Sequence, residues 1–157
     1  MIELTCPTSY NTIHNFHAHK SVFIAGGISN CPDWQQDMLA LLRTIPSNII
    51  TMNPRRDDFD ITDLDSSSFQ IEWEHEHLAV ADAVLFWFPK ETLCPITLYE
   101  LGVITTRDAP RVFVGCHPEY ARRFDVIKQL SLSRPDITVH SSIEDLARDV
   151  NEWIDLY

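Results

Sequence analysis

The segment from Ala83 to Phe88 is an uninterrupted run of apolar residues, and it limits the folds that this chain can adopt. A sheet strand with one face in water alternates apolar and polar residues, whereas a strand without polar positions needs cover on both faces. Other short runs rich in β-branched or aromatic residues lie at 21–25, 48–52, 111–114 and 137–139. These runs predict buried strands.

The segments between these runs have the spacing of apolar residues that is typical of helices. Trp34, Met38 and Leu41 recur at helical spacing after Pro32, a residue favoured near a helix start. Capping and spacing predict further helices at about 66–81, from 95 onward, at 120–130 and at 143–157.

Strands and helices therefore alternate, with connections too long for hairpins. This order favours right-handed crossovers and a parallel sheet of about five strands. The predicted fold class is α/β, a single doubly wound, flavodoxin-like domain. Ligands of such domains bind beyond the carboxyl ends of the strands, where the strand order reverses, so the segments after the first three runs are the candidate site.

The length of 157 residues and the 45% content of hydrophobic residues suit one compact domain. We expect this domain to cover residues 21–157. Residues 1–20, which include His14, His17 and His19, are expected to form a polar N-terminal arm.

The net charge of -11 argues against several classes of partner, because it repels phosphate backbones and anionic membranes. We therefore predict no nucleic-acid or membrane partner. No apolar run approaches the roughly 18 residues of a membrane span, and no secretory signal pattern begins the chain, so a cytoplasmic protein is expected.

The cysteines, at positions 6, 31, 94 and 116, are scattered, which favours reduced thiols over a disulfide framework or a zinc site. The histidines near the N-terminus, and His75 with His77, match no recognised ligand pattern. We predict neither a metal nor a cofactor.

Glu100 is the first candidate for chemistry. It follows Pro95 by little more than one helical turn, and Ile96, Val103 and Ile104 are its helical neighbours. The pattern predicts a carboxylate on a buried stripe, where an unpaired charge is costly and is usually paired or kept for function. The alternative is that Glu100 only stabilises the start of its helix.

Glu74 repeats this pattern on the preceding helix, with Ile71, Leu78 and Ala81 on its face. Two such carboxylates flank the apolar run from Ala83. Paired carboxylates suit glycosidic chemistry, in which one attacks the sugar and the other manages the proton of the leaving group. The alternative is a solvated face of an acidic helix.

Gly26 and Gly27 follow the first apolar run, but they complete neither a dinucleotide-binding nor a triphosphate-binding motif. They suit close approach of the backbone to a ligand, or simply a tight turn. Arg55 and Arg56 follow the second run, where they could clamp a phosphate or pair locally with Asp57 and Asp58.

The stretch from Ile71 to Phe88, continued by Pro95 to Gly102 with its Glu-Leu-Gly element, resembles the nucleoside 2-deoxyribosyltransferase superfamily. Val22 to Gly27 is similar to the first strand and glycine turn of that family. The likeness extends from about Ser21 to Gly115 and is strongest to the shorter branch that contains Trp-Glu.

The resemblance implies that Glu100 attacks the anomeric carbon and forms a covalent glycosyl-enzyme, with Glu74 as the carboxylate on the side of the base. It also implies substrate contacts by residues of the glycine turn and of neighbouring segments, namely Gly26, Gly27, Ile28, Asp82, Arg55 and Trp34. The alternative is a purely structural role for Asp82, Trp34 and Trp87. The implied partners are a nucleoside or nucleotide, a free nucleobase and further copies of the chain in a homo-oligomer.

One departure matters, because classical members carry an Asp where this chain has Cys94. Related enzymes hydrolyse nucleoside 5′-monophosphates, and Arg55 with Arg56 keeps that activity as an alternative. A nucleotide-binding domain without turnover is a further alternative. The homo-oligomer is also favoured by Trp153, Ile154 and Tyr157 near the end of the last helix.

Overall fold

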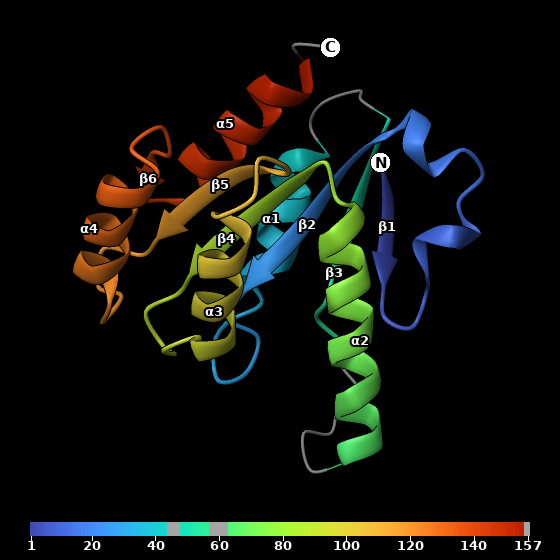
Figure 1. Ribbon diagram of the computed structural model, residues 1–157, viewed down its shortest axis with the longest axis horizontal. Helices are drawn as coiled ribbons and strands as arrows, with labels where there is room; N and C mark the ends of the chain where they lie inside the picture. The colour runs from blue at the N-terminus through green and yellow to red at the C-terminus, as the bar shows by residue number, and fades with distance from the viewer. Residues whose placement is uncertain (44–47, 57–62, 156–157) are drawn as a thin grey trace.

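The fold is built on one parallel sheet, shown in Figure 1. The computed structural model describes residues 1–43, 48–56 and 63–155. The sheet has six strands in the order β1-β3-β2-β4-β5-β6. Their bounds are β1 (Ile2–Thr5), β2 (Lys20–Gly26), β3 (Ile49–Asn53), β4 (Ala83–Phe88), β5 (Arg111–Cys116) and β6 (Val139–His140).

The strand order confirms the predicted fold class. From β2 the chain crosses to β3 on one side, and it then returns past β2 to β4 on the other side. The order therefore reverses between β2 and β4, as in a doubly wound, flavodoxin-like sheet. The ligand site is expected beyond the ends of these two strands.

The sheet has one strand more than expected, because β1 pairs with β3 at the edge. The expectation of a polar arm over residues 1–20 did not include this strand. It has only four residues, of which Leu4 alone is buried, so its sequence pattern is weak. Tyr10 and Phe16, which follow in two short 3₁₀ turns, Tyr10–Thr12 and Phe16–Ala18, also pack on the core.

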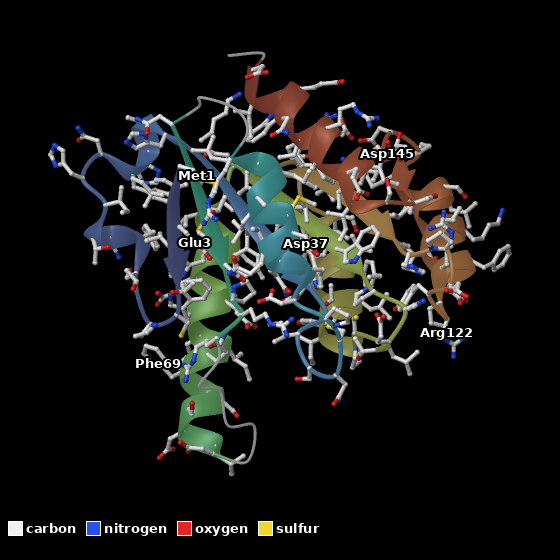
Figure 2. The ribbon with its side chains drawn as sticks, turned by 180° about the vertical axis from the view of Figure 1, so that it is seen from behind. Met1, Glu3, Asp37, Phe69, Arg122 and Asp145 are labelled. Carbon is white, nitrogen blue, oxygen red and sulfur yellow. The ribbon has the colours of Figure 1, made fainter. Side chains whose placement is uncertain are left out.

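Helices cover both faces of the sheet, as Figures 1 and 2 show from opposite sides. One face packs against α1 (Trp34–Leu42) and α5 (Ile143–Asp155). The other packs against α2 (Leu64–Val80), α3 (Pro95–Ile104) and α4 (Arg123–Ser133). Along β4, Val84, Phe86 and Phe88 face α2, α3 and α4, while Leu85 and Trp87 face α1 and α5. The apolar run is therefore buried on both faces, as predicted.

Two helices begin at aspartates that the sequence did not single out as caps. Asp33 caps α1 by accepting a hydrogen bond from the backbone N–H of Gln36 at 3.2 Å, and Asp63 caps α2 by accepting from that of Asp65 at 3.1 Å. The helix α2 therefore begins slightly before the predicted start at about residue 66. Across the described residues, no helix is both long and apolar enough to cross a membrane.

Candidate active site

The carboxyl ends of the central strands bring three loop segments to one edge of the sheet. Gly27 and Ile28 follow β2, Pro54 follows β3, and the segment 89–94 follows β4. The first halves of α2 and α3 lie beside this edge, and α2 extends past the sheet (Figure 1). This edge is therefore where the predicted site residues of different segments can meet.

Glu100 lies on α3, half-buried beside this edge. Burial, together with the charge of Glu74, raises the pKa of Glu100 from 4.5 to about 8. No hydrogen bond or ion pair joins its carboxylate to another of the described residues. A carboxyl group in this setting holds its proton at neutral pH in the absence of a ligand.

Glu74 lies on α2 and is also half-buried. Its Oε1 atom accepts a hydrogen bond from Nε2 of Gln70 at 2.8 Å. Burial raises the pKa of Glu74, and the hydrogen bond from Gln70 opposes this by stabilising the charged form. Glu74 therefore differs from Glu100, because it has a donor that supports its negative charge.

The two carboxyl groups act as a coupled pair. The helices α2 and α3 cover the same face of the sheet, and the charge of Glu74 reaches Glu100. Burial raises the pKa of both groups, and for Glu100 the neighbouring charge of Glu74 adds to this rise. Glu100, whose pKa reaches about 8, therefore holds a proton at neutral pH.

The predicted apolar stripes are only partly buried. Leu78 and Ile104 are buried, but Ile71 on α2 and Ile96 on α3 are each 64% exposed. Both lie about one turn before the carboxylates along their helices, and α2 projects past the sheet (Figure 1). Phe69, labelled in Figure 2, lies on the same projecting part of α2 and is half exposed. The buried stripe residues named here follow the carboxylates along the chain, and the exposed ones precede them.

The turn after β2 needs both of its glycines. A Cβ atom at Gly26 would collide with the indole ring of Trp34 and would lie 2.5 Å from the carbonyl oxygen of Trp87. A Cβ atom at Gly27 would lie 2.8 Å from Pro89 and 2.9 Å from Sγ of Cys94. The glycines thus allow the turn after β2 to touch the loop after β4, at the point where the strand order reverses.

Trp34 supports this turn from inside the core. Its Nε1 atom donates to the carbonyl oxygen of Gly27 at 2.8 Å, and its side chain is buried against the face that α1 and α5 cover. Trp87 is buried in the same cluster. Both tryptophans therefore have the structural placement that was the alternative to stacking on a substrate.

Arg55 is held by the loop before α1. Its Nη1 atom donates to the carbonyl oxygen of Pro32 at 3.2 Å and to Oε1 of Gln35 at 3.1 Å, while Nη2 donates to the carbonyl oxygen of Cys31 at 3.4 Å. Asp33 lies 3.7 Å from its Nε atom. Arg55 therefore braces the turn that contains Gly27 and Ile28. Asp57 and Asp58, the alternative partners of the arginine pair, lie outside the described residues.

Asp82 lies immediately before β4, at the amino ends of the strands, whereas the candidate site lies at their carboxyl ends. Its Oδ2 atom accepts hydrogen bonds from the backbone N–H and the hydroxyl of Ser21, each at 2.8 Å. These bonds tie the start of β4 to β2. The structure brings the charge of Glu74 within reach of Glu100, and it places the glycine turn against the loop that precedes α3. Asp82, before β4, is not part of either contact.

The sequence profile of the nucleoside 2-deoxyribosyltransferase-like family matches residues 19–120, which is more than half of the chain. The chain belongs to this family. A search of curated proteins finds no match. Membership confirms the resemblance seen in the sequence and supports a glycosyl-transferring enzyme as the general class, with nucleosides and nucleobases as its small-molecule substrates.

Within this family member, Cys94 stands where classical members carry an Asp. Cys94 has a left-handed backbone conformation, with φ of 48°, directly before Pro95 at the start of α3. Burial, together with Cys31, raises the pKa of the Cys94 thiol to about 12, so the thiol is neutral. The site therefore has a neutral group in place of a further carboxylate.

Gln70 and Tyr120 are site-supporting residues that the sequence analysis missed. Tyr120 donates from its hydroxyl to the carbonyl oxygen of Leu93 at 2.8 Å and so fixes the loop before α3. Gln70 precedes Glu74 by four residues, a spacing that places side chains together on a helix, so this signal was present in the sequence. The partner of Tyr120 is distant along the chain and had no such signal.

The histidine clusters do not assemble a metal site. His14 and His17 are exposed, while His77 is buried and accepts a hydrogen bond from the backbone N–H of Tyr10 at 3.1 Å. Over residues 1–43, 48–56 and 63–155, no three potential ligands among His, Cys, Asp and Glu are grouped to hold a metal ion.

Proposed function

We propose that this protein is a nucleoside 2-deoxyribosyltransferase, which cleaves the N-glycosidic bond of a nucleoside and transfers the sugar to another nucleobase. The observation that carries this proposal is the coupling of Glu74 and Glu100, two half-buried carboxyl groups from adjacent helices. A buried acid pair of this kind is characteristic of glycosidic chemistry. Family membership supplies the class of substrate.

The proposed reaction uses the single proton of the pair. As substrate binds, the proton passes from Glu100 to Glu74, which leaves Glu100 as a carboxylate. A carboxylate oxygen of Glu100 then forms a bond to C1′ while the bond from C1′ to the base nitrogen breaks. The electron pair goes to the base, which takes the proton from Glu74.

The second half of the reaction reverses these steps. An incoming base attacks C1′, the bond to Glu100 breaks, and Glu74 accepts the proton that the incoming base loses. The pair returns to its starting charge. If water attacks instead, the product is free sugar, and the same site acts as a hydrolase.

The contacts of Arg55 favour a nucleoside over a nucleoside 5′-monophosphate. Arg55 already donates to the carbonyl oxygens of Pro32 and Cys31 and lies close to Asp33. Binding a phosphate would require it to give up these contacts. The negative charge of Glu74 would also repel a phosphate group nearby.

The outer face of α3 supports the proposed homo-oligomer. Ile96 is 64% exposed and Tyr99 is 71% exposed, and a Cβ atom at Gly102 would meet no atom within 4 Å. A glycine inside a helix costs about 0.5–1 kcal/mol relative to alanine, and no contact with the described residues requires it here. We propose that this face packs against α3 of a second copy.

The residues of the C-terminal helix that the sequence suggested for an oligomer interface contact the chain itself. Ile154 is buried in the chain's own core, and Trp153 packs against Phe113 and Lys20. Tyr157 lies outside the described residues. All four cysteines are free thiols, which suits a reducing compartment, and the cytoplasm is the proposed location.

The decisive experiment is to incubate the protein with a deoxynucleoside and a second free base, and then to separate the products by chromatography. Formation of the new nucleoside supports the transferase. Release of base without a new nucleoside assigns a hydrolase, and the same assay with a monophosphate separates that alternative. If a panel of nucleosides and monophosphates is bound but left intact, the protein is a binding domain and the proposal is wrong.

A further inference from the structure

Gln70 connects the carboxylate pair to the end of a strand. It is only 6% exposed, and its Nε2 atom donates two hydrogen bonds of 2.8 Å each. One goes to Oε1 of Glu74, one turn along α2, and the other goes to the carbonyl oxygen of Pro54, directly after β3. The amide group is therefore fixed by the backbone at one end and by Glu74 at the other.

The other half of the same amide group is unsatisfied. Its Oε1 atom is buried, and it has no hydrogen-bond partner in the part of the chain that the structure describes. Leaving a buried acceptor unpaired is costly, and an apolar side chain of the same size would avoid that cost. Rotating the amide would bring Oε1 against two other acceptors, so the orientation is set by its partners. Gln70 therefore contributes through its donor.

We infer that Gln70 is a positioning residue of the carboxylate pair, which holds Oε1 of Glu74 and leaves Oε2 as the oxygen that carries the moving proton. The inference rests on the proposed function for its catalytic meaning. No other hydrogen bond to Glu74 is formed among the described residues, so Oε2 can take up and release a proton.

The groups around the pair are consistent with this division of roles. Glu100 faces Glu74 from α3, and the Cys94 thiol at the start of α3 is neutral. His77 lies near Glu74 on α2, where burial lowers its pKa and favours the neutral ring. Arg56 contacts Ser66 at the start of α2. Gln70 is the group that donates to Glu74, and it favours the arrangement with the proton on Glu100.

Gln70 also supports the departure of the base. Once the proton has passed from Glu100 to Oε2 of Glu74, its transfer to the base leaves Glu74 negatively charged. The bond from Gln70 stabilises that charge, so it makes Glu74 a stronger acid at the moment of donation. The exchange involves one proton and requires no further reactant.

The test is a titration by NMR of protein with ¹³C-labelled glutamate carboxyl groups, which needs no catalysis. In Gln70→Met, the pKa of Glu74 should rise by about one unit or more, because hydrogen bonds to charged groups are worth about 1.5–3 kcal/mol. The control is Gln35→Met, which removes another buried amide and should leave the pKa of Glu74 unchanged. An unchanged pKa of Glu74 in Gln70→Met overturns the inference.

A second measurement uses the unsubstituted protein, in case Gln70→Met does not fold. The side-chain N–H resonances of Gln70 should shift with the pKa of Glu74 and not with that of Glu100. Resonances that stay constant through the titration of Glu74 would contradict the inference. Neither NMR measurement depends on turnover of a nucleoside. A failure of the proposed function would appear in the nucleoside assay and would leave the NMR results unchanged.

Activity provides the readout that a purely structural role would not produce. Gln70→Met should slow a natural nucleoside about tenfold more than an analogue whose base leaves without a proton, because general acid catalysis alone is affected. Equal slowing of both substrates would show that Gln70 only supports the packing of α2 on β3, and would overturn the catalytic part of the inference.

Discussion

Glu100 and Glu74 are coupled across neighbouring helices: burial raises the pKa of Glu100, the charge of Glu74 raises it further, and it reaches about 8 with no hydrogen-bond donor of its own among the described residues. Glu74 has such a donor in Gln70. The two carboxyl groups are therefore unequal before substrate binds, and each can be tested by a substitution that removes its charge.

Replacing Glu100 by Ala should abolish turnover, with a loss of about 10⁴-fold or more, because the proposed nucleophile is removed. Chromatographic assay of base release measures the loss. Circular dichroism and the melting temperature serve as controls, since trimming a half-buried acid should leave the fold intact. A mass increase on the peptide that contains Glu100 would identify the covalent intermediate, and retained activity would refute the assignment.

Replacing Glu74 by Gln should increase stability near pH 8. A carboxyl group whose pKa is raised on folding binds its proton more tightly in the folded state, so stability falls as pH climbs from about 4.5 to about 8. Removing the charge of Glu74 lowers the pKa of Glu100 and reduces this fall, by on the order of 1 kcal/mol. Urea unfolding at pH 5 and pH 8 measures the change in the free energy of unfolding that the substitution causes. An equal change at the two pH values would contradict the coupling.

The alternation of apolar runs and helices was sufficient to predict the fold class, because a buried parallel strand such as β4 has no polar positions. The edge strand β1 was missed for the converse reason. It has few residues and little burial, and its pairing with β3 joins segments that are distant along the chain.

The acid pair was predictable because both carboxylates follow helical spacing and the topology brings their helices to one face. Hydrogen bonds to backbone carbonyl groups were not predictable in the same way. The sequence shows that Arg55 is a cation but not that the carbonyl oxygens of Pro32 and Cys31 converge on it. Ile96 was expected in a buried stripe, whereas it is 64% exposed, because helical spacing alone does not show which part of a stripe a neighbouring element covers.

Replacing Arg55 by Ala should weaken substrate binding without changing the preference for a nucleoside over its monophosphate. Arg55 holds the loop at Pro32 and Cys31, so its loss should loosen the glycine turn and raise KM for both substrates by a similar factor, roughly tenfold for the loss of a charge-assisted contact. Steady-state kinetics on a matched pair gives the ratio. A loss confined to the monophosphate would identify Arg55 as a phosphate clamp.

Replacing Tyr99 by Glu should dissociate the proposed oligomer. Tyr99 is 71% exposed on α3 beside Gly102, and a buried charge at a packed helix face would cost several kcal/mol. Sedimentation equilibrium at micromolar concentration measures the state of assembly. Phe124→Glu is the matched control, since Phe124 is 77% exposed on α4, and it should leave the oligomer intact. An unsubstituted protein that is purely monomeric would remove the basis of this prediction.

Activity should fall above about pH 8, as the pair loses the last proton that Glu74 needs for the departing base. The Glu74→Gln variant isolates that proton, because Gln keeps the size of the side chain and cannot donate as an acid. It should slow a natural nucleoside by about 10²-fold or more, the usual range of general acid catalysis, and affect much less an analogue with an activated base. The activated substrate should also lose its alkaline decline in the variant, since no proton is then required. If Glu74→Gln slows both substrates equally, Glu74 shapes the pocket for the base, and the proton must come from another donor.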